Sequence, residues 1–133
     1  MKKSKMVLLS LFLFTLTECV TTEPDNYITF HCVENSTSGT RNYLIDVRRS
    51  TKDTTIYAFS NFHYVSNEGD CDIRIKRTQN NLTFSPASQQ IGYTDFVIRS
   101  GSGVSNDDFT WIKFDYVIFN GKNDIPVQTI LTR

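Results

Sequence analysis

Few side chains of this sequence could work together as an acid, a base and a nucleophile. The 133 residues include only two histidines, His31 and His63. Catalysis of the serine or cysteine type needs a histidine that contacts the nucleophile and is oriented by a carboxylate. His31 directly precedes Cys32, so on a strand their side chains would point to opposite faces. Since G-x-S-x-G, H-E-x-x-H and a glycine-rich phosphate loop are also absent, the sequence predicts a protein that is not an enzyme and uses no cofactor.

Two acidic clusters could offer oxygen ligands to a calcium ion. One contains Glu68, Asp70 and Asp72, and the other spans residues 106–108. Neither cluster has the D-x-D/N-x-D/N-G spacing and the later glutamate that an EF-hand loop requires. The clusters therefore favour solvated turns, and no metal site is predicted.

Aromatic residues are the most distinctive part of the composition. The chain has ten Phe, six Tyr and one Trp, which together make 13% of its residues. Tyrosine and tryptophan are enriched in binding hot spots. Those that alternate with polar residues could form an exposed recognition face, or they could form a second layer of core. The candidates for binding are Trp111, Tyr116, Tyr57 and Tyr64.

The charges of the whole chain cancel, with fourteen basic and fourteen acidic residues. This balance gives no electrostatic footprint for nucleic acid. Two local basic groups occur, Arg48, Arg49 and Lys52 in one and Arg74, Lys76 and Arg77 in the other. Acidic neighbours offset both groups, which favours solvated strand faces. A modest patch for an anionic polymer or for lipid headgroups is the alternative.

The N-terminus has the pattern of a secretory signal peptide. Three lysines lie within the first five residues, and an apolar run follows at residues 6–16. This run is too short to cross a bilayer core of ~30 Å, which takes about 20 helical residues. Positive charge, a short apolar stretch and a small polar segment together predict a signal peptide at residues 1–19, and therefore export.

The sequence leaves two positions for cleavage of this signal peptide. Leu16-Thr17-Glu18-Cys19 resembles the lipobox of bacterial lipoproteins, although Glu18 stands where that pattern has a small residue. The resemblance implies that Cys19 is lipidated and that the chain is anchored to a membrane. An ordinary cut just after Cys19 would instead release a soluble secreted protein. The predicted localisation is thus a periplasmic or outer-membrane lipoprotein, or secretion.

Either cut leaves two cysteines, Cys32 and Cys71. In an oxidising compartment a disulfide between them would persist. In the chain-entropy model, closing a loop of this length stabilises a fold by about 4 kcal/mol. Two unpaired buried thiols are the alternative.

From Tyr27 onward, side chains alternate between apolar and polar, as in strands with one buried face. Asn120-Gly121 suits a tight hairpin that pairs the last two strands. Residues 101–108 contain turn-forming residues and are predicted as a loop. Seven or eight short strands predict an all-β fold, a small antiparallel β-sandwich or barrel. They are expected at 27–33, 43–48, 54–60, 71–77, 94–99, 109–120 and 125–132, and more weakly at 62–65 and 82–84.

Two N-glycosylation sequons begin at Asn35 and Asn81. Both fall in predicted turns. They could be used only in a eukaryotic or viral setting, and the organism does not follow from the sequence.

These features predict a short tether at residues 20–26 and a single β domain at residues 27–133. The expected function is non-catalytic binding of a protein partner or a cell-envelope polymer. In architecture the chain is similar to small periplasmic lysozyme inhibitors, which implies an inhibitor-like role as one form of such binding. The alternative is a structural or assembly component of an envelope or secretion structure. In that case residues 125–132 would offer an unpaired edge strand for β-augmentation.

Overall fold

The computed structural model describes residues 22–64, 72–92 and 94–133, and within them nearly all regular structure is β. One 3₁₀ helix, η1 (Phe62–Tyr64), follows the third strand. The strands are β1 (Thr22–Ser36), β2 (Gly39–Ser50), β3 (Ile56–Phe59), β4 (Ile73–Thr78), β5 (Asn81–Phe84), β6 (Gln89–Gln90), β7 (Val97–Ser105), β8 (Trp111–Phe119) and β9 (Asp124–Thr132).

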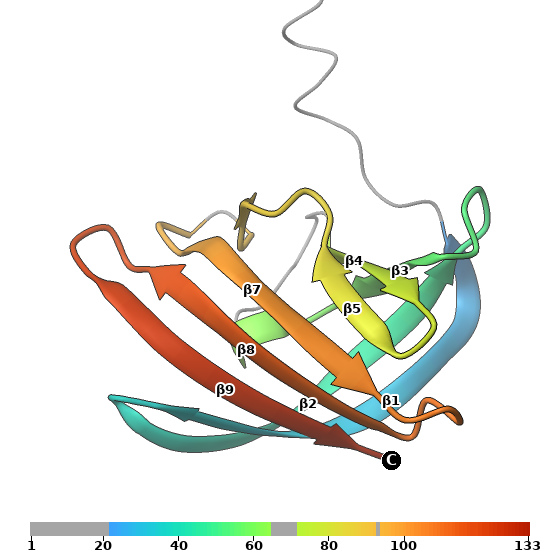
Figure 1. Cartoon of the computed structure of the whole chain (residues 1–133), viewed down its shortest axis with the longest axis horizontal. Coiled ribbons are helices and arrows are strands. Elements are labelled where there is room, and N and C mark those ends of the chain that lie inside the picture. Colours follow the sequence, from blue (N-terminus) through green and yellow to red (C-terminus); the bar gives the residue numbers. More distant parts are fainter. Residues whose placement is uncertain (1–21, 65–71, 93) are drawn as a thin grey trace, which may run out of the picture.

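Eight of these strands close into an antiparallel barrel (Figure 1). Strands that follow one another in sequence pair from β1 to β5 and from β7 to β9, and the pairs β5–β7 and β1–β9 complete the ring. The short strand β6 adds to β7 outside this ring. The all-β prediction is therefore confirmed, and between the two architectures that the sequence left open the chain adopts the barrel.

The last strand is not an edge. From Val127 to Thr132, β9 pairs with β1 on one side and with β8 on the other. The prediction that residues 125–132 offer an unpaired edge is therefore wrong. Pro126 lies just beyond the part of β9 that pairs with β1, so its missing N–H leaves that ladder intact.

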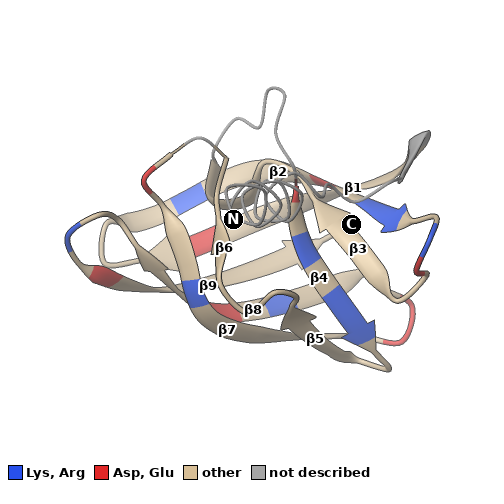
Figure 2. Ribbon diagram, turned by 90° about the horizontal axis from the view of Figure 1, so that it is seen from above, with Lys and Arg blue, Asp and Glu red and all other residues tan. Residues whose placement is uncertain are grey.

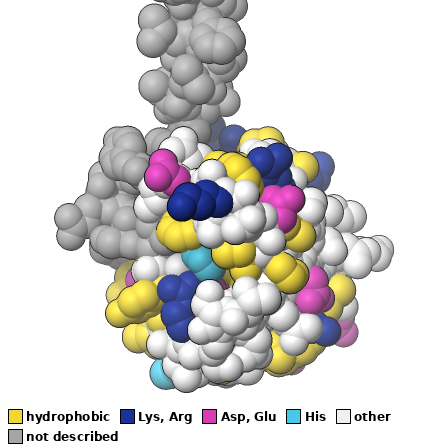
Figure 3. Space-filling view, turned by 90° about the vertical axis from the view of Figure 1, so that its left-hand side faces the viewer, with side chains coloured by type: hydrophobic (Ala, Val, Ile, Leu, Met, Phe, Trp, Pro, Cys, Tyr) yellow, Lys and Arg dark blue, Asp and Glu magenta, His cyan; other side chains and the backbone are white. Residues whose placement is uncertain are grey.

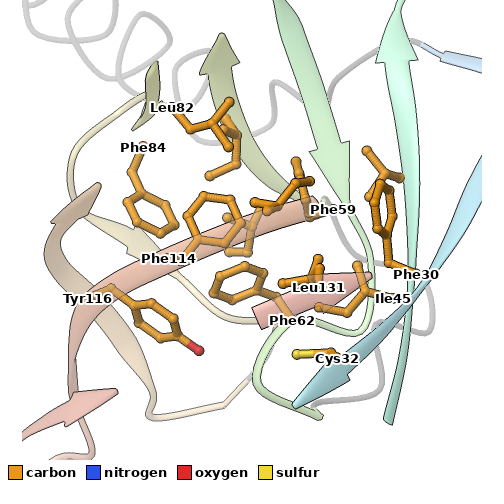
Figure 4. Packing of buried hydrophobic residues seen from close by; sticks show 14 of the residues in the cluster. Phe30, Cys32, Ile45, Phe59, Phe62, Leu82, Phe84, Phe114, Tyr116 and Leu131 are labelled. Carbon is orange, nitrogen blue, oxygen red and sulfur yellow. The ribbon is translucent and has the colours of Figure 1, made fainter. Parts of the chain in front are cut away.

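Aromatic side chains fill the interior of the barrel. Phe62 projects inward from η1, and its ring centroid lies 5.1 to 6.4 Å from those of Phe59, Phe84, Phe114 and Tyr116 (Figure 4). An eight-stranded barrel is just wide enough for side chains to fill it. The rings therefore occupy the interior space in which some barrels of this size hold a small ligand.

The segment around Phe62 was expected to be a weak strand at residues 62–65, and this prediction is wrong for its described part. Asn61, His63 and Tyr64 have φ values of 57°, 60° and 55°. Positive φ values interrupt an extended chain. The backbone instead forms the short turn of η1, which directs Phe62 into the core.

The prediction of a loop over residues 101–108 is wrong for its first half, because β7 continues to Ser105. Gly101 and Gly103 lie opposite Tyr116 and Phe114 in β8. A Cβ atom at Gly101 would lie 2.4 Å from the Cβ of Tyr116, and one at Gly103 would lie 2.4 Å from Cδ1 of Phe114. These glycines thus make room for the aromatic core, although they resemble turn residues in the sequence.

The hairpin at Asn120 is confirmed, since β8 and β9 pair antiparallel around it. Its loop spans residues 120–123. The side-chain Oδ1 of Asn120 accepts the main-chain N–H groups of Lys122 and Asn123 at 2.9 and 2.8 Å. Gly121 supplies the positive φ, 93°.

Several predictions concern residues outside the described part of the chain. These are the signal peptide at 1–19 with Cys19, and also Cys71, Glu68 and Asp70. Cys32 lies in the core and is 1% exposed, and its disulfide with Cys71 stays a prediction. The strand β1 begins at Thr22, within the range assigned to the tether. In the described residues no helix is long and apolar enough to cross a bilayer.

Candidate functional site

The two ends of the barrel present different chemistry. One end, here called the mouth, consists of the loops 51–55, 79–80 and 106–110 and the strand ends that they join. The other, here called the Glu34 end, carries the β1–β2 turn, η1 and the β8–β9 loop. Charged side chains stand at inward-facing positions at both ends.

The mouth holds an open depression of about 570 Å³. Its walls come from the ends of β2, β3 and β4 and from all three loops. Tyr57 lies in this lining and is only 9% exposed. Beside it, the ring of Phe109 closes the core, with centroids 4.9 Å from that of Tyr57 and 5.8 Å from that of Phe30. The depression therefore has an aromatic floor and does not extend into the barrel.

Arg49 stands on one wall of the depression. It occupies the inward-facing position after Val47 on β2, directly opposite Tyr57 on β3. Its Nε donates to the main-chain oxygen of Thr54 at 2.7 Å. The guanidinium carbon lies 5.8 Å from the centroid of the Tyr57 ring, a cation–π distance.

Arg77 stands on β4, next to β3, and also lines the depression. Figure 2 shows that β4 carries Lys and Arg residues. Its Nε donates to the main-chain oxygen of Gln79 at 2.8 Å. Its Nη2 donates to the main-chain oxygens of Asn106 and Asp107 at 3.4 and 3.2 Å. The guanidinium carbon lies 4.6 Å from the centroid of Phe109. Carbonyl oxygens and an aromatic ring thus hold this side chain in place.

Neither mouth arginine has a carboxylate within ion-pair distance in the described part of the chain. Arg99 differs from both: it lies 4.1 Å from the Phe119 ring centroid and also 3.4 Å from a carboxylate oxygen of Asp124. Among the residues that line the depression, Asp107 is the one acid, and its Oδ1 accepts the side-chain amide of Asn80 at 2.6 Å. Asp53 and Asp108 lie in the same loops, outside this lining. The arginines give the depression a positive balance.

The Glu34 end has a buried carboxylate. Glu34 is 1% exposed and continues the inward-facing positions of Phe30 and Cys32 on β1. Its Oε1 accepts hydrogen bonds from Arg41, which stands directly opposite on β2. Its Oε2 accepts the hydroxyl groups of Tyr43 at 2.7 Å and of Tyr116 at 3.4 Å.

His63 completes the hydrogen bonding of this carboxylate. Its Nδ1 lies 2.8 Å from Oε2 of Glu34, and because a carboxylate only accepts, Nδ1 carries the hydrogen. The Nη2 of Arg41 also donates to the main-chain oxygen of His63 at 3.2 Å. Glu34 and Arg41 thereby tie η1 to the first hairpin. Figure 3 looks onto this end and shows charged side chains of both signs among hydrophobic ones.

Burial and hydrogen bonding set the protonation of the carboxyl, thiol and phenol groups at this end. Burial would raise the pKa of Glu34, but the hydrogen bonds from His63, Arg41 and Tyr43 outweigh it and lower the pKa to about 2. Burial raises the pKa of the Cys32 thiol to about 11. Burial and the charge of Glu34 also raise the pKa values of both tyrosines. The thiol and the phenols stay protonated, and the one ionised acid already accepts several hydrogen bonds.

The structure does not bring the four predicted binding residues together. Tyr57 lines the mouth, and Trp111 begins β8 beside the loop 106–110, where it is partly exposed. Tyr64 is 62% exposed at the Glu34 end. Tyr116 is 3% exposed and belongs to the interior. In the described residues no group of three His, Cys, Asp or Glu side chains could hold a metal ion.

Sequence reasoning missed the roles of Glu34, Arg41 and His63. For the basic groups that contain Arg49 and Arg77 it favoured solvated strand faces, with a modest patch for an anionic polymer or lipid headgroups as the alternative. A usable signal was present for four of these five. The period of two that makes Tyr43, Ile45 and Val47 inward-facing extends to Arg41 and Arg49 at the two ends of β2. The same continuation applies to Glu34 on β1 and to Arg77 on β4. A charged residue in register with a buried face, at the end of a strand, marks the rim of a barrel.

Comparison of the chain with protein-family models, with curated proteins and with solved structures found no match. A barrel of this kind is compatible with many functions, because function belongs to sites that a fold carries. The geometry of the mouth and of the Glu34 end is therefore the basis for the function proposed below.

Proposed function

We propose that this chain is an exported domain that acts by non-catalytic binding and takes its partner at the mouth of the barrel. The partner is a protein or a cell-envelope polymer, of which one projecting group enters the depression. An inhibitor of an enzyme would be one form of such a binding domain.

The open depression at the mouth carries this proposal. The interior is filled by aromatic rings, so a ligand held inside the barrel has little support. The mouth offers about 570 Å³ of open space, with side chains that main-chain contacts hold in defined positions. Mouths of β-barrels are common ligand sites. Side chains that are ordered before binding lose little entropy on contact.

The Glu34 end supports a structural role rather than catalysis. Its carboxylate accepts hydrogen bonds from four side chains of the first hairpin, η1 and β8. A buried charge that is this well satisfied contributes to the shape of one end of the barrel. It offers no free base or nucleophile to a substrate.

The alternative, an assembly component that acts through β-augmentation, has less support. The strand expected to provide the free edge, β9, is paired on both sides from Val127 onward. Among the described residues, strand β6 pairs with β7 alone, but it has two residues, which is a short template for another chain.

Site-specific photo-crosslinking in the native host tests the proposed function. A benzophenone amino acid replaces Thr55, an exposed residue of the mouth, or Leu44, which is 50% exposed on the outer wall. We expect a covalent adduct of defined mass from position 55 and none from position 44. Adducts from position 44 alone, or from neither position, would contradict binding at the mouth.

A further inference from the structure

We infer that the mouth binds an oxyanion, a carboxylate, sulfate or phosphate group, through the guanidinium groups of Arg49 and Arg77. The inference rests on the proposed function, because the oxyanion would belong to the partner that enters the mouth. It goes further by naming the chemistry of the group that is recognised and the two side chains that recognise it.

Arg49 has most of its donors free. A guanidinium group carries five N–H donors, and the Nε hydrogen of Arg49 is taken by Thr54. In the described residues no acceptor contacts Nη1 or Nη2 of this side chain. Its edge can therefore donate two parallel hydrogen bonds to an oxyanion, the arrangement for which arginine is preferred.

Arg77 is fixed more firmly and has fewer free donors. Three main-chain oxygens accept from its Nε and Nη2. Nη1 has no partner in the part of the chain that the structure describes. These contacts and the Phe109 ring hold the guanidinium group in a fixed position. Arg77 can therefore offer an anion a positive charge at a defined place and a hydrogen-bond donor at Nη1.

The charges around the depression favour an external anion. In the described residues Arg41 pairs with Glu34 and Arg99 pairs with Asp124, whereas Arg49 and Arg77 have no carboxylate partner. Asp107 opposes an anion, and its Oδ1 is already bonded to Asn80. Because the depression is open to water, the guanidinium groups lose little solvation when an anion binds.

Arginine side-chain resonances of the ¹⁵N-labelled full chain report on this site. Inorganic phosphate and sodium acetate are titrated separately, with sodium chloride holding the ionic strength constant. We expect saturable shifts of the Nε–Hε signals of Arg49 and Arg77, and little change at Arg99, which already has a carboxylate. Saturation by phosphate alone or by acetate alone also supports the inference and identifies the preferred group.

Three variants separate recognition from structure. Arg49→Gln, at an exposed side chain, should weaken binding about tenfold, the effect of losing a charge-assisted hydrogen bond. Arg99→Gln is the matched control and should leave binding unchanged. Asp107→Asn should strengthen binding several-fold, because it removes the opposing charge and keeps an oxygen for Asn80. A merely structural role of the arginines would not produce that gain.

A linear, unsaturable response that is equal at all three arginines would overturn the inference, since it reflects screening only. So would unchanged binding in Arg49→Gln. These failures differ from failure of the proposed function. A crosslink at position 55 without anion binding would support binding of a partner at the mouth and contradict recognition of an oxyanion. Anion binding without a crosslink would support recognition of an oxyanion and contradict binding of a partner at the mouth.

Discussion

Arg41 and Arg49 stand on the same strand and the same face, at opposite ends of the barrel. Arg41 meets the buried carboxylate of Glu34 across the β1–β2 ladder. Arg49 meets Tyr57 across the β2–β3 ladder and has no carboxylate in the described chain. The residue type and the strand position are equivalent, so the facing residue decides what each arginine does.

The two arginines therefore have different roles, Arg41 in stabilising the fold and Arg49 in binding a partner. At the Glu34 end, Arg41 donates to the carboxylate and to the main chain of His63, so its charge is used within the fold. At the mouth, the charge of Arg49 stays available to a partner. Changes at the Glu34 end should therefore mainly lower stability, and changes at the mouth should mainly lower binding.

Loss of the ring that closes the Glu34 end should have the largest effect. Phe62→Ala removes a side chain that is 1% exposed and packed against four other rings. We expect the free energy of unfolding to fall by about 4 kcal/mol, measured by denaturant titration. Tyr64→Ala, at the exposed end of the same 3₁₀ helix, is the control and should cost less than about 1 kcal/mol. Equal losses in the two variants would mean that η1 does not anchor this end.

Neutralising the buried carboxylate should have the next largest effect. Glu34→Gln leaves Arg41 without its ion pair and disrupts the acceptor shared by the tyrosines and His63. We expect a loss of about 3 kcal/mol in the free energy of unfolding. Asp115→Asn on the outer wall, where the side chain is 63% exposed, should change stability by less than about 1 kcal/mol. A neutral outcome for Glu34→Gln would remove the structural role assigned to this end.

Acid should weaken the same end. Folding lowers the pKa of Glu34 from 4.5 to about 2, so the carboxylate contributes its full stabilisation above the unfolded pKa. That contribution is lost as the pH falls from 4.5 through about 2, and at ~1.4 kcal/mol per pKa unit it is about 3 kcal/mol. Thermal unfolding at a series of pH values should show a steeper loss for the native chain than for Glu34→Gln. Parallel curves would contradict the assignment.

Arg41 and Arg49 provide the most direct test of the difference between the ends, with the smallest effects on stability. Arg41→Gln should lower the free energy of unfolding by about 2 kcal/mol, the contribution of hydrogen bonds to a charged group. Arg49→Gln should lower it by less than about 0.5 kcal/mol, as is usual for exposed positions, while reducing anion binding. Denaturant titration of both variants checks this. The reverse order of stabilities would mean that the two ends have been assigned the wrong roles.

The sequence by itself determined which side of β2 and of β4 is buried. Alternation placed Tyr43, Ile45 and Val47 on the inner face of β2, and Ile73 and Ile75 on that of β4. These assignments hold because the period of two is a local property of extended backbone. Asn120-Gly121 likewise specified the β8–β9 hairpin through its own conformational preferences.

Only the tertiary structure decided between sandwich and barrel and assembled the residues of each of the two sites. Closure requires β5 to pair with β7 and β1 with β9, and a local pattern contains no record of partners that distant. Glu34 and Tyr116 meet across 82 positions in the sequence because the ring closes. From sequence alone, Gly101 and Gly103 suggested a turn. In the structure they lie within β7, because the side chains of Tyr116 and Phe114 in β8 occupy the space where a Cβ atom would stand. The sequence shows that Arg41 and Arg49 are charged. Strand pairing decides whether a carboxylate faces each of them, because the facing residue comes from another strand.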